Sequence, residues 1–415
     1  MIATSTTFSS SRIGIWLVGV SFVLFQFFLQ LSSGVVIGSI MHDMKLSGLT
    51  AGLLGSSLYV VYTALQIPVG ILFDRKNTRM LMAVNAFICS MGCLVFASSH
   101  SLAGLFIGRF LIGAGSAFAF IGLSHLLRQH FPLRQFAFMI GFSETLGFIV
   151  TVIGMISMGS LLSQWGWRGF INAAGICGLV IAFLSWKYIP DSPANRPISN
   201  YGQQLSQIVS NGKAWINGLY VGLCFTIVTV FGALWAIPFL QIKLSCSLPQ
   251  ASLLGAVFFL GAAVSCPLFG WLSTYFARRR SLILSSCLST TMLLIILIYL
   301  PVQSHLLVGM LMFTIGICCG AYMLAYTIAN ELAPPNSFST CAGFTNTLAI
   351  ITAPLLQPFT GYLLDTLSDH GIYTLGDYQI ALLTVPISLI IAGILVFFLP
   401  EKITPSLQRD RADNY

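Results

Sequence analysis

Long apolar runs separated by short polar gaps cover almost the whole sequence. A helix needs about 20 apolar residues to cross roughly 30 Å of hydrocarbon, and the runs reach that length. Only helices or closed barrels satisfy the backbone inside lipid, and the runs lack the alternating pattern of a barrel. We therefore predict an all-α polytopic membrane protein with twelve spans, at about 13–36, 49–72, 79–98, 101–126, 136–160, 168–189, 214–241, 249–273, 281–301, 304–329, 338–363 and 376–399.

Charged residues are scarce, at 7% of the chain, whereas a soluble domain carries roughly a quarter. The acidic residues fall in polar gaps with one clear exception, Glu144, in the apolar stretch GFSETLGF at 141–148. The first run lacks a small-residue cleavage signature and is too long for a signal-peptide core, so we expect it to be retained.

Lysine and arginine are distributed unevenly between the two sets of gaps. With the N-terminus inside, fifteen of the nineteen fall on the cytoplasmic side, Lys45, Arg168 and Lys243 fall outside, and Arg109 lies within a span. The positive-inside rule then places both termini in the cytoplasm. The net charge of +8 is therefore explained by the cytoplasmic lysines and arginines of a protein in a lipid bilayer. It does not require a nucleic-acid partner.

The sequence contains a weak internal repeat. GILFDRKNTR at 70–79 precedes GWLSTYFARR at 270–279 by 200 positions, and GFSETL at 141–146 precedes GFTNTL at 343–348 by 202. The similar offsets predict a duplicated six-helix unit with its substrate site between the halves, where Glu144 corresponds to Asn346. We expect bundles at 1–189 and 214–399, joined by a cytoplasmic linker at 190–213 and followed by a tail at 400–415.

Two of these motifs resemble those of a known family. The segment 70–79 resembles the cytoplasmic signature of the major facilitator superfamily, Gly-x-Leu-x-Asp-Arg-x-Gly-Arg-Arg, with Asn77 where the family usually has glycine. A degenerate copy occupies 270–280, and GRFLIGAGSAF at 108–118 resembles the family's fourth-helix motif. The resemblance implies two pseudo-symmetric six-helix bundles, alternating-access transport of a small solute, and no enzyme activity.

Other stretches are similar to the phagosomal nutrient transporter branch of intracellular bacteria, whose members import amino acids or nucleosides. They are YTALQIPVGILFDR at 62–75, ALWAIPFLQ at 233–241, and NELAPPNSFSTCAGFTN at 330–346 followed by Gln357 and Pro358. Related branches carry organic acids or siderophores, so these classes stay open. We expect a monomer in a bacterial inner membrane.

The resemblance assigns a gating role to Gly70, Asp74, Arg75 and Arg79. In the family, the carboxylate at the position of Asp74 docks against the N-terminal end of the eleventh helix and favours the outward-open state, with the two arginines holding it. A carboxylate near a positive helix end gains about 0.3–1 kcal/mol. The alternative is a solvated, positive-inside loop.

Two charged residues lie deep in predicted spans. Glu144 lies roughly 12 Å into the fifth helix, where an ionised carboxylate costs several kcal/mol unless it faces water or a cation. We expect it to carry the coupling proton, the alternative being a permanently protonated side chain bonded to a neighbouring helix. We expect Arg109 to line a cavity, because an arginine within a span is costly unless it is paired or faces water. The resemblance implies that it influences proton movement or binds an anionic group of the substrate. The alternative is an arginine that snorkels to the outer interface or bonds to nearby carbonyls.

Pairs of polar residues four positions apart share one helix face. In this superfamily the first, fourth, seventh and tenth helices line the cavity, so an aromatic and amide pocket is expected there. The alternative for the aromatic members is a place at the membrane interface. The candidates are Gln26, Gln30, Trp235, Tyr322, Tyr326 and Asn346.

The remaining polar residues suggest no chemistry. Asp365, Asp369, His370 and Asp377 are interpreted as a solvated rim of the last outer loop. They do not indicate a metal site, and the ten cysteines, without a Cys-x-x-Cys, predict no disulfide.

The leading function is therefore import of a small organic solute by proton symport, because no phosphate-binding Gly-x-x-x-x-Gly-Lys-Ser/Thr is present to use a nucleotide. No cofactor is expected, and the proton gradient is the driving force. The alternatives are a proton-coupled drug or metabolite exporter and, from other classes, a polytopic membrane enzyme or a non-transporting receptor.

Overall fold

A computed structural model describes residues 12–401 apart from Ser32, Pro132, 192–200, Ala277, 334–337, His370 and Gly371. Twelve of its helical segments are long and apolar enough to cross a membrane. In the described part of the chain, the only extended pairing is an isolated bridge between Asp369 and Ile372. The predicted all-α class with twelve spans is confirmed.

The N-terminal half supplies six of these spans. It comprises α1 (Arg12–Leu31), α2 (Ser33–Met44), α3 (Gly48–Arg75), α4 (Thr78–Ser98), α5 (Leu102–His130) and α6 (Leu133–Tyr188). Side chains of Ser47, Asn77 and Ser101 cap the starts of α3, α4 and α5. The long α6 holds two spans that reverse direction at Gly166, whose φ of 65° favours glycine.

The C-terminal half supplies the other six spans after a short helix, α7 (Tyr201–Val209), which lies in the predicted linker. Two of the spans change helix type midway. The elements are α8 (Gly212–Thr226), the π-helix η1 (Ile227–Trp235), α9 (Ala236–Leu244), α10 (Leu248–Phe276), α11 (Arg279–Tyr299), α12 (His305–Cys318), the 3-10 helix η2 (Cys319–Met323), α13 (Leu324–Leu332), α14 (Phe338–Leu367), α15 (Leu375–Ala381), α16 (Thr384–Leu395) and η3 (Val396–Phe398).

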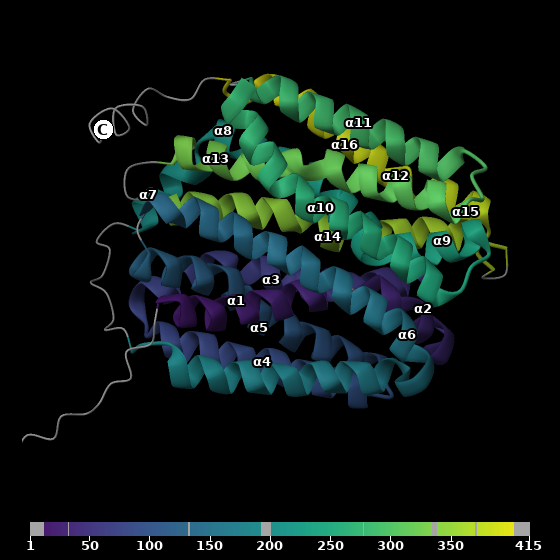
Figure 1. The fold of residues 1–415 in the computed structure, drawn as a ribbon, viewed down its shortest axis with the longest axis horizontal. Coiled ribbons are helices and arrows are strands. Elements are labelled where there is room, and N and C mark those ends of the chain that lie inside the picture. Colours follow the sequence, from purple (N-terminus) through teal and green to yellow (C-terminus); the bar gives the residue numbers. More distant parts are fainter. Residues whose placement is uncertain are drawn as a thin grey trace, which may run out of the picture.

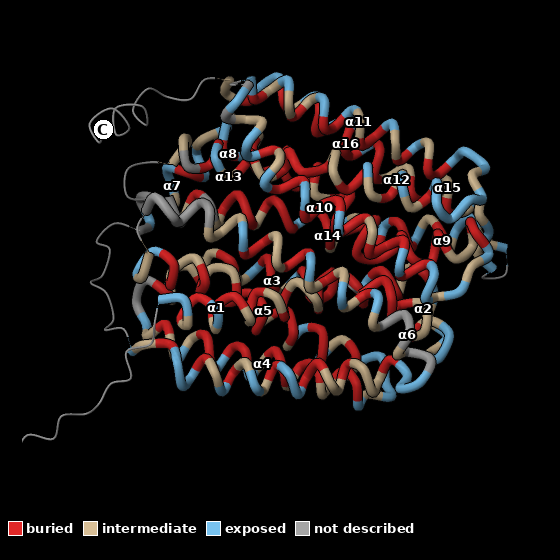
Figure 2. The backbone as a smooth tube through the Cα atoms, in the orientation of Figure 1, coloured by how far each residue is buried: buried red, intermediate tan, exposed pale blue. Residues whose placement is uncertain are grey.

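The two halves lie side by side with their helices roughly parallel to one long axis (Figure 1). We call the end at which α1 begins and η3 ends the terminal end, and the opposite end the distal end. Buried residues concentrate where helices face one another, and exposed apolar residues occupy the outer faces (Figure 2). This inverted surface is typical of a bundle that faces lipid.

The halves meet through α3 against α14 and through α6 against α10. On the distal side the first pair is in backbone contact, since a Cβ added at Gly52 would lie 2.5 Å from the Gln357 carbonyl oxygen. In the second pair, the rings of Phe148 and Phe259 stack at 6.2 Å. Towards the terminal end, a Cβ at Gly70 or Gly343 would have no described atom of another helix within 4 Å. The distal side is therefore the closed one.

The two arginines that the sequence repeat matches, Arg79 and Arg279, each form an ion pair at the terminal end. Arg79 Nη2 lies 2.7 Å from Asp191 Oδ2, and Arg279, 200 positions later, binds both carboxylate oxygens of Glu331 at 2.7 and 2.8 Å. Asn77 stands where the family usually has glycine because its side chain caps α4. The side chains of Asp74 and Arg75 lie outside the described residues, so the predicted latch stays a prediction.

One interpretation of the last loop is wrong. Asp365 is not a solvated rim residue, because its carboxylate accepts hydrogen bonds from the backbone N–H groups of Gly48 and Leu49, both at 2.7 Å. Asp377 instead forms a local capping box with Thr374 at the start of α15. All ten cysteines are free thiols.

Candidate functional site

A cavity of about 50 Å³ lies between the halves and brings together six of the residues singled out from the sequence. Its lining includes Glu144 from the N-terminal half and its repeat counterpart Asn346 from the C-terminal half. The duplication thus places a carboxylate and an amide around one space. The other four expected residues in the lining are Gln26, Gln30, Tyr322 and Tyr326.

Helices with an interruption in mid-span supply much of this lining. Thr229 lies in the π-helix η1, and Tyr322 lies in the 3-10 helix η2. Such departures from α geometry leave backbone groups free to reorient, and they are frequent at functional sites. The cavity lining therefore includes residues from the interrupted parts of two spans.

A chain of side-chain hydrogen bonds crosses the cavity wall. Gln26 Nε2 donates to Gln30 Oε1 at 3.1 Å. On the other side, the Tyr326 hydroxyl donates to Asn346 Oδ1 at 2.7 Å, and Asn346 Nδ2 donates to Gln66 Oε1 at 3.0 Å. The last of these bonds joins the two halves. The positions of these amides are therefore coupled across the interface.

Three polar atoms of the lining are buried and have no hydrogen-bond partner among the described residues. They are Glu144 Oε2, Gln26 Oε1 and Gln30 Nε2. Glu144 is only 8% exposed, and the cavity lining contains no lysine, arginine or histidine. Buried polar atoms are nearly always paired in folded proteins, so three orphans in one cavity indicate groups that await a ligand or a proton.

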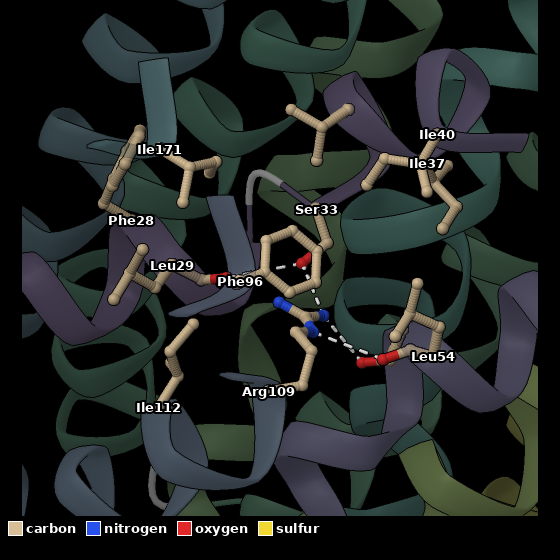
Figure 3. A pocket seen from close by; sticks show the side chains of 12 residues that line it. Phe28, Leu29, Ser33, Ile37, Ile40, Leu54, Phe96, Arg109, Ile112 and Ile171 are labelled. Atoms are coloured by element: carbon tan, nitrogen blue, oxygen red, sulfur yellow. Dashed lines mark hydrogen bonds between the residues drawn. The ribbon is translucent and has the colours of Figure 1, made fainter. Parts of the chain in front are cut away.

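Arg109 lies outside this cavity, against a second one of about 30 Å³ with an otherwise mostly apolar lining (Figure 3). Its Nε donates to the Leu54 carbonyl at 3.2 Å, and its Nη2 donates to the Gly55 carbonyl at 2.8 Å and to Ser33 Oγ at 3.0 Å. Two of the three acceptors are backbone carbonyls, as in the alternative in which the arginine bonds to nearby carbonyls. These bonds connect α5 to α2 and α3.

Trp235 also lies outside the central cavity lining. It is fully buried at the end of η1, and its indole Nε1 donates to the Gln357 carbonyl at 3.3 Å. Trp235 is placed as a packing residue between η1 and α14.

Sequence reasoning missed several lining residues. Apart from Thr229, they are aromatic or aliphatic residues that a run of apolar sequence does not distinguish from lipid-facing ones. Gln66 was overlooked beside the cavity, although an amide in a span is itself a signal. The missed lining residues are Phe27, Leu31, Tyr59, Tyr62, Phe120, Phe148, Phe225, Thr229 and Ile350.

The fold is a bundle of twelve candidate membrane spans with a polar and aromatic cavity between its two halves. The sequence matches the family model of the Major Facilitator Superfamily over residues 15–351 and 228–413. The chain therefore belongs to the major facilitator superfamily, as its motifs indicated, and it is a transporter of small solutes rather than an enzyme.

Known members of the family resemble the chain along most of its length. A probable galactarate/D-glucarate transporter of Escherichia coli is 24% identical, with 78% of this chain and 80% of the relative covered. A bacterial homologue of the human lysosomal transporter Spinster, in an inward-facing and occupied conformation, matches with a TM-score of 0.76, 18% identity, and 94% and 97% coverage. The nucleoside transporter NupG matches with a TM-score of 0.71, 13% identity, and 93% and 97% coverage.

Proposed function

We propose that the protein is a proton symporter that imports a small polar solute, with Glu144 as the proton carrier. The observation that carries this proposal is the buried cavity residue Glu144: its Oε2 has no hydrogen-bond partner, and the lining has no basic side chain, among the residues that the structure describes. Desolvation favours the neutral form of such a carboxylate. A proton taken up from the acidic side and released on the other side would drive the cycle.

The substrate that the cavity supports best is an uncharged or amine-bearing solute. Gln26 Oε1 and Glu144 Oε2 can accept hydrogen bonds, and Gln30 Nε2 can donate one. Aromatic side chains supply area for a ring or an apolar group. A dicarboxylate such as galactarate would bring two negative charges to a lining that holds a carboxylate and no cation. Among the predicted classes, we therefore favour a nucleoside or amino acid over an organic acid.

The cavity must widen before it can hold such a solute. Its volume of about 50 Å³ is well below the several hundred Å³ typical of ligand pockets. The structure is closed at the distal end, and the interrupted spans provide the freedom to expand. Substrate binding would then separate Gln26 from Gln30 or Asn346 from Gln66, whose amides are the natural partners for its polar groups.

The positive-inside bias places the terminal end in the cytoplasm of a bacterial inner membrane, where we expect a monomer. The state closed at the distal end is then inward-facing. Solute and proton would enter together from outside and leave at the cytoplasmic side.

Proteoliposome uptake tests the coupling. A thermal-shift screen against amino acids, nucleosides, organic acids and iron chelates first identifies a ligand, because binding to the folded state raises stability. We expect Glu144→Gln to bind that ligand and exchange it, but to lose accumulation under an imposed pH gradient. Full gradient-driven accumulation by Glu144→Gln would show that the proton moves elsewhere.

A charge-relocation variant serves as the matched experiment. Glu144→Gln combined with Asn346→Asp returns one carboxylate to the cavity from the opposite half. Partial recovery of pH-driven uptake is expected if the carboxylate itself is what the site requires. If pH-driven uptake does not recover while solute exchange stays intact, the proton must be carried by a carboxylate at position 144 itself.

A further inference from the structure

Two backbone N–H groups at the distal start of α3 donate hydrogen bonds to a side chain of the other half. A helix leaves its first four N–H groups without intrahelical partners. In α3 the side chain of the N-cap residue Ser47 accepts from Thr50, and the Ser47 carbonyl accepts the first regular helical bond, from Ala51. The first two N–H groups, on Gly48 and Leu49, donate to the carboxylate of Asp365, which comes from the other half.

We call the contact of Asp365 with Gly48 and Leu49 the distal junction, and Tyr373 also takes part in it. Its hydroxyl donates to Asp365 Oδ1 at 2.6 Å and lies 2.7 Å from the Gly48 nitrogen, which donates to it. The carboxylate therefore receives three hydrogen bonds and faces the positive end of a 28-residue helix. Charge-assisted bonds of this kind are shorter and stronger than neutral ones. The junction is a bond between halves rather than a local cap.

The helix contact beneath the junction depends on the absence of side chains. A Cβ on Gly361 would lie 2.1 Å from the Gly48 carbonyl oxygen, and a Cβ on Gly48 would lie 2.9 Å from Asp365 Oδ1. One helical turn further on, Gly52 abuts Gln357. The glycines let the backbones approach closely enough for the carboxylate to reach both N–H groups.

We propose that Asp365, with Tyr373, is the distal latch of the transport cycle, which stabilises the state closed at the distal end. Opening that end requires α3 and α14 to separate. The separation breaks the bonds from Gly48 and Leu49 and removes the carboxylate from the helix end. The latch therefore sets the ratio of the two access states without contacting the solute.

A distance measurement between spin labels tests the latch without any substrate. His100→Cys and Gln303→Cys place labels at exposed distal positions of the two halves, between α4 and α5 and between α11 and α12, in a background without reactive native thiols. We expect Asp365→Asn to raise the ratio of distal-open to distal-closed molecules about tenfold, because a charged bond pair is lost. Tyr373→Phe should raise it by a smaller factor.

Two further variants test whether the change in the distance distribution is specific to the bonds of Asp365. Gly361→Ala should open the distal end sterically with the carboxylate intact. Asp377→Asn is the matched control, because Asp377 caps α15 within its own half and its loss should leave the distances unchanged. An unchanged distribution in folded Asp365→Asn and Tyr373→Phe would overturn the latch, as would an equal shift in Asp377→Asn. Neither result depends on whether Glu144 carries the proton.

Discussion

Asn346 Nδ2 donates a hydrogen bond to Gln66 Oε1 at 3.0 Å, and this bond joins α14 to α3 beside the central cavity. Asn346 also accepts the hydroxyl of Tyr326, so one amide links two helices of its own half to the opposite half. Beyond it, towards the terminal end, Gly70 and Gly343 face open space. The bond therefore lies where the two halves begin to part.

We expect Gln66→Leu to weaken solute binding about threefold to tenfold, because losing one hydrogen bond that orients the cavity amide costs about 1 kcal/mol. A thermal-shift titration with the identified solute measures the change. Thr360→Val is the control, since the Thr360 hydroxyl bonds to the Leu356 carbonyl and to Thr384 Oγ1, both away from the cavity lining. An unchanged affinity in Gln66→Leu would mean that Asn346 holds its position through Tyr326 alone.

The ion pairs of Arg79 and Arg279 should differ sharply in their contribution to stability. Side chains of Arg279 and Glu331 are 7% and 4% exposed, against 29% and 60% for Arg79 and Asp191. Glu331→Gln leaves a buried, unpaired guanidinium and should cost about 3 kcal/mol. Asp191→Asn should cost about 1 kcal/mol or less. Thermal unfolding in one detergent compares them, and equal losses would contradict this assignment.

Much of the cavity could be predicted from the sequence because polar residues in apolar spans have few places to lie. Gln26 and Gln30 share a helix face, and the repeat offset pairs Glu144 with Asn346. Run length, however, does not reveal where a helix deforms. The π-helix at Ile227–Trp235 and the 3-10 turn at Cys319–Met323 depart from the regular helical spacing on which the prediction rests, and Trp235, at the end of the π-helix, lies outside the cavity lining.

Asp365 illustrates a second limit of the sequence. An acidic residue at the end of a span resembles a solvated rim residue unless its partner is known. That partner is the start of α3, whose N–H groups are 316 and 317 residues away along the chain. Gly48 and Gly361 made the approach possible, but a glycine in an apolar span has many other uses.

The charge bias predicts that the terminal end, including α7, is cytoplasmic. A cysteine introduced at the exposed Ser206 should resist an impermeant maleimide in intact cells and react after the membrane is permeabilised. The control is a cysteine at His100 on the distal side, which should react in both conditions. Labelling of the Ser206 variant in intact cells would reverse the topology.

Asp74 is predicted to favour the state open at the distal end, through the family's latch at the terminal end. Asp74→Asn should therefore lower the distal-open population several-fold, opposite in direction to Asp365→Asn, since a carboxylate near a helix N-terminus is worth about 0.3–1 kcal/mol. The same label pair measures it. A distribution equal to that of the unmodified protein would leave 70–79 as a solvated positive loop.

Variants of Arg109 distinguish a structural role of the fourth-helix motif from a role in binding the substrate. Its guanidinium spans α2, α3 and α5 through Ser33, Leu54 and Gly55, and its Cζ lies 6.0 Å from the ring centre of Phe96. Because the planar fork serves three acceptors at once, Arg109→Gln should destabilise the N-terminal half by about 2 kcal/mol or more. Arg109→Lys should recover only part of that stability, since a single ammonium cannot reproduce the fork. Thermal unfolding reports the loss, and the dissociation constant of the solute for the remaining folded protein should stay within about twofold. A large loss of affinity with normal stability would instead place an anionic group of the solute at Arg109.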